Sequence, residues 1–192
     1  MVIPDSLPRR GNSLTRAIGR LLLRLGGWRL TGEFPDAPKF VVAAAPHTSN
    51  WDGLWAIALF LATGVDFHWM AKKELFALPL LGRLFRWLGG VPVDRQAPRG
   101  LVEQAVDQFR RRDAFLLVIT PEGTRRRVEH WKTGFYRIAH AAQVPIVLGF
   151  VDYPRRLLGI GPTFVPRGEM EQEIAAMRAF FAQMTGRHPE RM

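Results

Sequence analysis

The amino-acid sequence predicts a single α/β domain, a mostly parallel mixed sheet flanked by helices, with a basic amphipathic helix at its amino-terminal end. The chain of 192 residues is 47% hydrophobic and 23% charged, which suits one globular domain. Apolar runs typical of buried strands alternate with segments of helical periodicity, as in sheets whose parallel strands are joined by helices. Residues 114–120, "AFLLVIT", form the continuous apolar run expected of a central parallel strand.

The amino-terminal segment, residues 1–30, predicts a helix at a membrane surface. In "NSLTRAIGRLLLRLGGWRL" the apolar residues recur with helical spacing on a face that includes Leu21, while Arg16, Arg20 and Arg24 lie on another. A membrane-spanning helix needs roughly 20 mostly apolar residues, and an arginine in every turn excludes one here. The pattern favours a segment that lies in the interface of an anionic membrane. A helix packed on its own domain would show the same pattern and is the alternative.

The next three elements follow from apolar runs and chain breakers. Residues 40–45, "FVVAAA", predict a buried strand between two prolines, and residues 51–64 predict a helix that ends at Gly64. This helix is too short to span a bilayer, so we expect it in the core. Residues 65–72, "VDFHWMAK", predict a short strand.

Residues 74–90, "ELFALPLLGRLFRWLGG", predict one or two short helices divided at Pro79. The segment holds more large apolar residues than one face of a short helix must bury. An exposed apolar patch rimmed by arginines suits docking on a membrane, whereas a pair of core helices is the alternative. The residues expected to contact lipid are Leu80, Leu81, Phe85 and Trp87.

The second half of the chain continues the alternation of strands and helices. The elements expected are, in order, a strand and turn at 91–95, a helix at 100–112, the strand at 114–120, a helix at 134–143, a strand at 144–151, a strand at 161–165 and a closing helix at 169–184.

The charge balance narrows the class of partner. The chain has 27 Lys and Arg against 17 Asp and Glu, a formal net charge of +10, which favours an anionic membrane surface, a phosphorylated small molecule or nucleic acid. The basic residues accompany aliphatic segments and no nucleic-acid-binding module is present, so a nucleic-acid-binding protein is only a distant alternative. The absence of cysteine excludes disulfides and thiolate metal sites and fits a reducing compartment. The histidines lack the spacing of metal ligands, so no metal site is expected.

Two polar segments follow predicted strands, "PHTSNWD" after residues 40–45 and "TPEGTRRR" after residues 114–119, and therefore meet at one edge of a parallel sheet. His47 and Asp52 can approach each other only if His47 lies in a loop and Asp52 in the first turn of the following helix. The carboxylate would then accept the proton of one imidazole nitrogen and leave the other as a base. No serine or cysteine elbow is present, so the base would act directly on a substrate hydroxyl. A purely structural histidine is the alternative.

The second polar segment predicts an anion-binding turn. Gly123 permits a tight turn, Glu122 supplies a carboxylate, and the planar guanidinium of Arg125 suits phosphate. "GGVPVDR" places Arg95 after another short strand. A solvated charged turn is the alternative.

Four segments, in this order, resemble the motifs of the glycerolipid acyltransferase family, the superfamily of lysophosphatidic acid acyltransferases. They are His47-x4-Asp52, "GGVPVDR", "PEGTR" and "VPIV". The resemblance runs from about Phe40 to Phe150, more than half of the chain, and the combination of the first and third motifs makes it specific.

The resemblance implies a role for each matching residue. His47 would be the general base, Asp52 its orienting partner, and Pro145 a residue that contacts the acyl donor or shapes the site. The residues expected to bind the acceptor and its phosphate are Arg95, Glu122, Gly123, Thr124 and Arg125.

The implied enzyme is an O-acyltransferase without a cofactor. It would move a fatty acyl group from acyl-CoA or acyl carrier protein to the hydroxyl of a lysophosphatidic acid-like lyso-lipid, with no acyl-enzyme. Residues 31–192 would form the acyltransferase domain, peripheral on the cytoplasmic face of the cell membrane.

The chain departs from the family pattern at two motifs. The second motif often carries an aromatic residue where this chain has Pro92 or Val93, and the third often begins with Phe and ends in Ser where Thr120 and Arg126 stand. Another lyso-lipid or an amine-bearing lipid as acceptor, and an inactive lipid-binding relative, therefore stay open.

Overall fold

A computed structural model describes residues 1–94, 96–97 and 100–192 of the chain. Within these ranges the centre is a seven-stranded sheet in the order β1-β7-β6-β2-β5-β3-β4. The strands are β1 (Arg29–Thr31), β2 (Lys39–Ala45), β3 (Phe67–Lys72), β4 (Gly90–Val93), β5 (Phe115–Ile119), β6 (Ile146–Asp152) and β7 (Leu157–Phe164). All neighbours are parallel except β6 and β7, which are antiparallel. The predicted α/β domain with a mostly parallel mixed sheet is confirmed.

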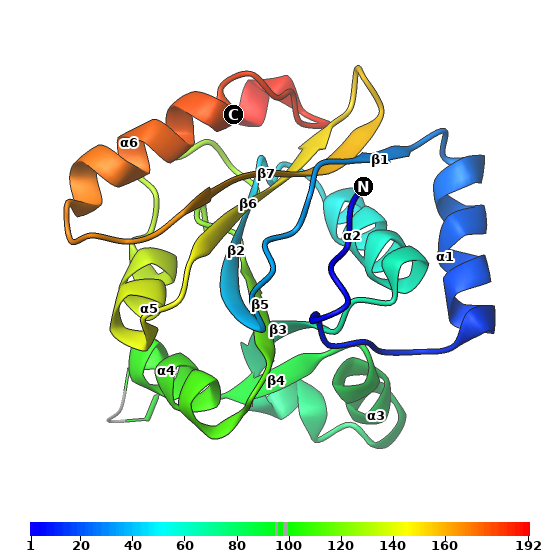
Figure 1. The fold of residues 1–192 in the computed structure, drawn as a ribbon, viewed down its shortest axis with the longest axis horizontal. Coiled ribbons are helices and arrows are strands. Elements are labelled where there is room, and N and C mark those ends of the chain that lie inside the picture. Colours follow the sequence, from blue (N-terminus) through cyan, green and yellow to red (C-terminus); the bar gives the residue numbers. More distant parts are fainter. Residues whose placement is uncertain (95, 98–99) are drawn as a thin grey trace.

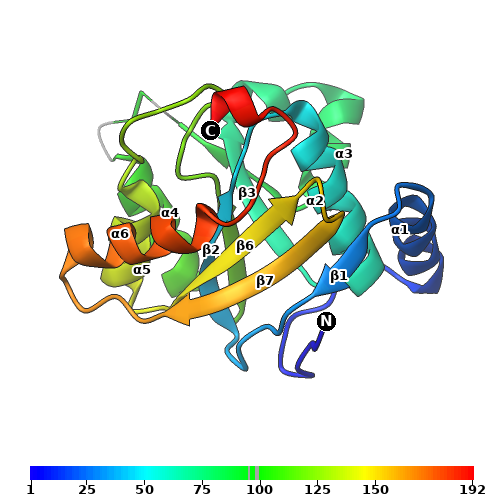
Figure 2. The ribbon, with the colours of Figure 1, turned by 90° about the horizontal axis from the view of Figure 1, so that it is seen from above.

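Helices cover both faces of the sheet. Figure 1 shows α1 and α2 on one side and α4, α5 and α6 on the other, and Figure 2 shows the same layers from above. The six α-helices in the described ranges are α1 (Ser13–Leu25), α2 (Asn50–Thr63), α3 (Pro79–Trp87), α4 (Leu101–Arg111), α5 (Gly134–Ala142) and α6 (Met170–Phe181), with 3₁₀ turns at Lys73–Phe76 and Pro189–Arg191.

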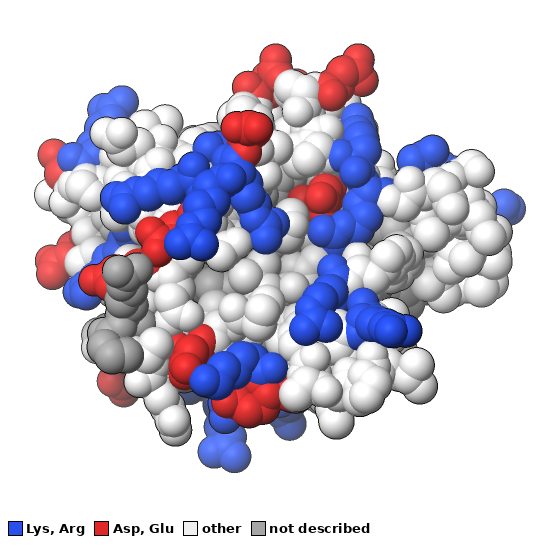
Figure 3. All heavy atoms as spheres, turned by 90° about the horizontal axis from the view of Figure 1, so that it is seen from below, with Lys and Arg blue, Asp and Glu red and all other residues white. Residues whose placement is uncertain are grey.

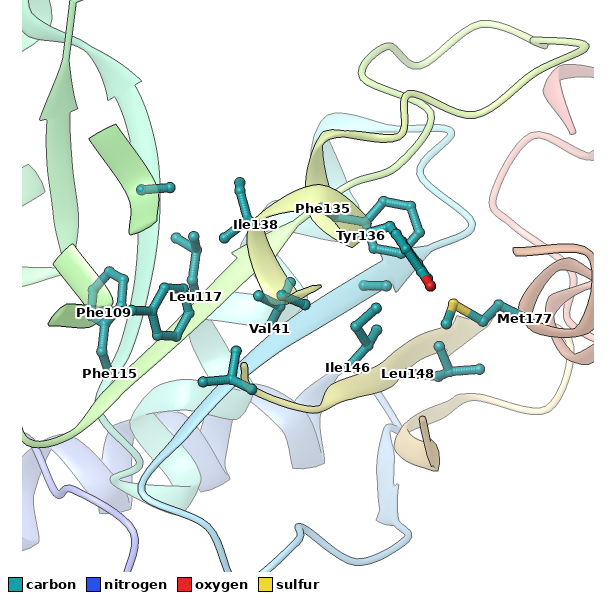
Figure 4. Packing of buried hydrophobic residues seen from close by; sticks show 14 of the residues in the cluster. Val41, Phe109, Phe115, Leu117, Phe135, Tyr136, Ile138, Ile146, Leu148 and Met177 are labelled. Carbon is teal, nitrogen blue, oxygen red and sulfur yellow. The ribbon is translucent and has the colours of Figure 1, made fainter. Parts of the chain in front are cut away.

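Successive side chains of β2 point to opposite faces of the sheet, so the strand contributes to two separate core clusters. Phe40 and Val42 pack in the cluster on the α2 side, whereas Val41 and Ala43 pack in the cluster beneath α4, α5 and α6. Figure 4 shows this second cluster, with Met177 of α6 close to the side chains of the sheet. Because β2 is buried on both faces, its sequence reads as one apolar run.

Two strands differ from the predicted elements. β1 was not predicted, because three residues with only partial burial give no clear pattern. β7 was predicted only at 161–165, but it begins at Leu157 because its first half pairs with the end of β6 across a short turn. The antiparallel pairing of β6 and β7 needs no crossover helix.

The helix α1 contacts its own domain and also presents an apolar stripe to solvent. It lies against α2 through Gly19, where a Cβ atom would come within 2.3 Å of the Ala62 nitrogen, and through the buried Leu23. The exposed fractions of the stripe run from 37% to 77% over Leu14, Ile18, Leu21, Leu22 and Leu25. The helix therefore packs on its own domain through part of its surface. Its place at a membrane and the division at residue 30 stay predictions.

The helix α3 also leaves apolar side chains in solvent. Leu80 is 81% exposed, and Leu81 and Trp87 are each 46% exposed. Phe85 is half-buried, with its ring 5.6 Å from that of Trp69 in an edge-on contact. Among the described residues, no helix combines the length and the hydropathy that crossing a membrane requires.

A buried histidine joins three parts of the chain. His68 of β3 has its Nε2 atom 2.8 Å from Nη1 of Arg112 and 3.3 Å from Nη2 of Arg10. Only a neutral imidazole accepts hydrogen bonds from two guanidinium groups. Burial, together with the charges of Arg112 and Arg10, lowers the pKa of His68 to about 3.

This neutral histidine predicts a loss of stability in mild acid. The unfolded chain takes up the His68 proton near pH 6.5, whereas the folded chain takes it up only near pH 3, so stability falls as the pH drops between these values. We expect the free energy of unfolding to decrease by about 2 kcal/mol from pH 7 to pH 5, measured by urea denaturation.

The variant His68→Gln is the control, because it cannot titrate. Its unfolding free energy should change less with pH than that of the wild type over the same interval. Parallel curves for the two proteins would contradict the assignment to His68.

Candidate active site

The first polar loop brings His47 and Asp52 together. The loop follows β2, and α2 begins with Ser49 as its N-cap and Asp52 in its first turn. Nδ1 of His47 lies 3.2 Å from Oδ2 of Asp52. A proton on Nδ1 then leaves Nε2 with a free lone pair, which is the arrangement of a general base and its orienting carboxylate. We refer to His47 and Asp52 as the dyad.

The Asp52 carboxylate is held by several hydrogen bonds. Its Oδ2 accepts from the backbone N–H groups of Thr48 and Ser49, each at 2.8 Å, and its Oδ1 accepts from the hydroxyl of Tyr153 at 2.7 Å. Burial alone would raise the pKa of Asp52, but the hydrogen bonds from His47, Tyr153 and the two backbone groups outweigh it and lower that pKa. Asp52 is therefore ionised in the pH range where an imidazole acts as a base.

The backbone donors at the start of α2 are already engaged. The N–H groups of Thr48 and Ser49 bond to Asp52, the N–H of Trp51 bonds to the Ser49 side chain, and the N–H of Asp52 bonds to the Ser49 carbonyl. These four groups are thus not free to stabilise an oxyanion in this structure.

The carboxylate of Glu122 supports the same loop from the neighbouring strand end. β2 and β5 are paired in parallel, so the turn after Ile119 lies beside the loop after Ala45. Oε1 of Glu122 accepts a hydrogen bond from the backbone N–H of His47 at 3.0 Å. Burial raises the pKa of Glu122, against the lowering effect of this bond. Its Oε2 atom is buried with no hydrogen-bond partner among the described atoms.

The turn itself requires glycine at residue 123. Gly123 has φ of +63°, and a Cβ atom there would lie 2.7 Å from Cδ of Lys132. The Lys132 side chain therefore lies directly over the turn, beside the half-buried Thr124 and the exposed Arg125. Lys132 and Arg125 thus place two cationic side chains at this edge of the sheet.

One residue implied by the family resemblance, Pro145, does not lie with the others. Pro145 precedes β6, where its carbonyl accepts from the N–H of Val41, and the cavity described below does not include it. β6 runs parallel to β2, so Pro145 lies at the amino end of the sheet, five residues or about 16 Å along the strand from the level of Ala45, where β2 ends. Arg95 lies outside the described residues.

A cavity of about 740 Å³ reaches the dyad, within the usual range for ligand pockets. His47, Asp52, Thr120 and Lys132 are among its polar lining residues. The apolar lining residues include Val42, Ala56, Ile57, Val118, Leu158 and Ile160 towards α2, and Val102, Phe135 and Ile138 towards α4 and α5. The site therefore combines a base with space for a hydrocarbon chain.

Sequence reasoning missed Tyr153. It considered Lys132 as a residue of the acceptor pocket but favoured the start of the next helix. Lys132 precedes α5 and lines the cavity, in agreement with its position shortly after "TPEGTRRR". Tyr153 lies 101 residues from Asp52 in the sequence, and no local pattern connects the two.

A family model described as Acyltransferase matches residues 31–148, which contain the dyad, the Glu122 turn and most of the sheet. The chain belongs to this acyltransferase family.

Within the family, the chain is similar to proteins named 1-acyl-sn-glycerol-3-phosphate acyltransferase. It is 29% identical to the one from Streptococcus pneumoniae, and the match covers 68% of this chain and 48% of that protein. It is 31% identical to the one from Escherichia coli, and this match covers 58% of this chain and 47% of that protein. The chain thus spans about half the length of these relatives. The crystal structure of the 1-acyl-sn-glycerophosphate acyltransferase from Thermotoga maritima shares the fold, with a TM-score of 0.60 and 22% identity over 88% of this chain and 76% of that one.

The contact between Glu122 and the dyad loop predicts opposite effects for two substitutions. Glu122→Ala leaves the His47 N–H without its acceptor, and we expect a loss of about 1–3 kcal/mol in the free energy of unfolding at pH 7. Glu122→Gln keeps an acceptor oxygen and removes a charge that burial disfavours, so this variant should be at least as stable as the wild type.

Urea denaturation of the three proteins measures the difference. Equal losses of unfolding free energy in both variants would contradict this role of Glu122, in which an uncharged oxygen is enough to accept the hydrogen bond from the His47 N–H.

Proposed function

We propose that the protein transfers a fatty acyl group from an acyl thioester to the hydroxyl of a lysophosphatidic acid-like acceptor. One observation carries the proposal: the dyad contact of 3.2 Å lies at an apolar cavity large enough for a hydrocarbon chain. The names of the relatives support the acceptor class, and their reaction would place the protein in phospholipid biosynthesis. The donor would be acyl-CoA or acyl carrier protein.

The dyad performs the proposed reaction in one addition and one elimination. Nε2 of His47 takes the proton of the acceptor hydroxyl as its oxygen attacks the thioester carbonyl carbon. Asp52 stabilises the imidazolium that forms, because its ionised Oδ2 faces Nδ1. Collapse of the tetrahedral intermediate breaks the carbon–sulfur bond, and the imidazolium returns the proton to the thiolate. The acyl group never becomes attached to the protein.

The cationic groups at the Glu122 turn would hold the acceptor phosphate. Arg125 is exposed beside the turn, and Lys132 both covers Gly123 and lines the cavity. A phosphate fixed there would keep its hydroxyl near His47, which lowers the entropic cost of the attack. Arg95, which follows β4 in the sequence, would belong to the same group.

Replacement of the base tests the proposed reaction. We expect His47→Ala to lower the rate of acyl transfer by about 10²–10⁴-fold, the usual contribution of general base catalysis. The assay follows a labelled long-chain acyl-CoA, or acyl carrier protein, in detergent micelles. The acceptors are lysophosphatidic acid, other lyso-phospholipids, glycerol 3-phosphate and an amine-bearing lyso-lipid.

The exposed His140 of α5 provides the control, and His140→Ala should retain wild-type activity. Full activity in His47→Ala would contradict the mechanism. Transfer only to a different acceptor would keep the mechanism and replace the substrate.

The same proposal includes peripheral attachment to an anionic membrane through α1 and α3. Both helices expose leucines, and α1 also carries Arg16, Arg20 and Arg24. Figure 3 shows the side of the molecule where α1 lies as a mostly white surface, with Lys and Arg side chains at its margins and across the adjacent face. Apolar side chains bordered by cations suit insertion between anionic headgroups.

Charge substitution in the α1 stripe tests this attachment. We expect Leu21→Glu with Leu25→Glu to weaken binding to phosphatidylglycerol vesicles by at least about tenfold, because two leucines lose their burial in lipid. Vesicle co-sedimentation at low salt measures the binding. The control is Val165→Glu, an exposed apolar residue beyond β7 that should leave binding unchanged. Equal binding by all three proteins would contradict docking through α1.

A further inference from the structure

The second oxygen of Asp52 faces a tyrosine from a distant part of the chain. Tyr153 follows β6, in the turn that leads to β7, and its hydroxyl donates to Oδ1 of Asp52 at 2.7 Å. Oδ2 of the same carboxylate faces Nδ1 of His47. The carboxylate is thus held at both oxygens, with the imidazole on one side and the phenol on the other.

The ring of Tyr153 is fixed independently of its hydroxyl. It packs edge-on against Trp28, with ring centroids 5.0 Å apart. The backbone N–H of Tyr153 donates to the carbonyl of Thr185 at 3.0 Å. Burial and the hydrogen bond to Asp52 raise the pKa of Tyr153, so the phenol keeps its proton and acts as a donor.

The carboxyl-terminal segment, residues 185–192, holds the other side of the dyad loop. The N–H of His188 donates to Oγ1 of Thr48 at 3.2 Å, and Nη1 of Arg191 donates to the Thr48 carbonyl at 3.4 Å. Figure 2 shows this segment crossing the edge of the sheet where β2 ends. The loop that carries His47 is therefore held between Glu122 of the adjacent turn and the carboxyl-terminal segment.

We infer that Tyr153 is a positioning residue for the dyad: its hydroxyl fixes the Asp52 carboxylate so that Oδ2 faces His47. The inference rests on the proposed acyl transfer by this dyad. Tyr153 lies beyond residues 31–148, the part of the chain that matches the family model. The inference therefore assigns a role to a residue in a part of the chain that the family match does not cover.

The hydroxyl has two effects on the dyad. It holds Oδ1, so the carboxylate cannot rotate away from His47, and it draws negative charge from the carboxylate. Without the Tyr153 hydroxyl, the Asp52 carboxylate is less well oriented, but its greater negative charge stabilises the protonated imidazole of His47 more strongly. The charged groups near the dyad include Glu122 of the turn after β5, Lys132 before α5, and Arg187 and Arg191 of the carboxyl-terminal segment. Arg187 faces Tyr153.

The variant Tyr153→Phe removes the oxygen and keeps the ring on Trp28. We expect kcat for acyl transfer to fall about tenfold while KM for the acceptor stays within about twofold, because the change touches no part of the substrate site. The acid limb of the kcat/KM profile should move to higher pH, since a carboxylate that loses a donor favours the protonated imidazole.

The chain contains one matched control. Tyr136 is the other of its two tyrosines, and it likewise donates to a carboxylate, Oε1 of Glu173, on the α5 side of the sheet. Tyr136→Phe removes the same atom and should leave kcat and the pH profile unchanged. A shift of the profile in both variants would show a general effect on the fold and would overturn the inference.

A second measurement needs no acyl substrate. Diethyl pyrocarbonate modifies unprotonated imidazole, and the rate at His47 can be followed by mass spectrometry of its peptide between pH 5 and 8. We expect the pH of half-maximal rate to rise in Tyr153→Phe and not in Tyr136→Phe. In an Asp52→Asn background, the loss of the Tyr153 hydroxyl should cause no further shift.

The two measurements separate the possible failures. If the wild type transfers no acyl group but the pH of half-maximal modification of His47 shifts as expected, the proposed function is overturned and the link between Tyr153 and the dyad stands. An active wild type, with Tyr153→Phe unchanged in both measurements, would overturn the inference.

Discussion

The Asp52 carboxylate holds the first turn of α2 and the imidazole of His47 at the same time. As the third residue of the helix it accepts the N–H groups of Thr48 and Ser49, which would otherwise lack partners at a helix start. The same oxygen faces Nδ1 of His47. Local helix capping therefore holds Oδ2 of the dyad carboxylate, while the Tyr153 hydroxyl holds Oδ1. A substitution of Asp52 changes both the base and the backbone that carries it.

The space for substrate comes from small residues at the end of a central strand. β2 ends in three alanines, and Ala44 and Ala45 line the cavity together with Gly149 of the adjacent β6. Larger side chains at these positions would fill the volume beside the dyad, because protein interiors are close-packed. The alanines keep the strand buried and apolar while leaving room for a ligand, so the same short run serves the sheet and the site.

The local patterns of the sequence predict the central strands, the helices and the placement of His47 and Asp52 around the start of α2. They do not predict contacts that depend on the assembled fold. Tyr153 reaches Asp52 across 101 residues, and Pro145 lies at the opposite end of the sheet from the dyad although its motif matches. The apolar stripe of α1 gives the same pattern whether it faces a core or a lipid surface. Only the assembled fold, in which Gly19 packs on α2 and the stripe is exposed, shows that the stripe faces outwards.

The contact between His188 and Thr48 joins residues 140 positions apart, and this separation has a consequence during synthesis. The ribosome releases β2 and α2 long before it releases Tyr153 and the carboxyl-terminal segment, because chains emerge from their amino end. Until then the loop with His47 lacks two of its supports. A nascent chain interrupted before Tyr153 would carry both members of the dyad and most of the sheet, but not the hydroxyl that holds Asp52 in place.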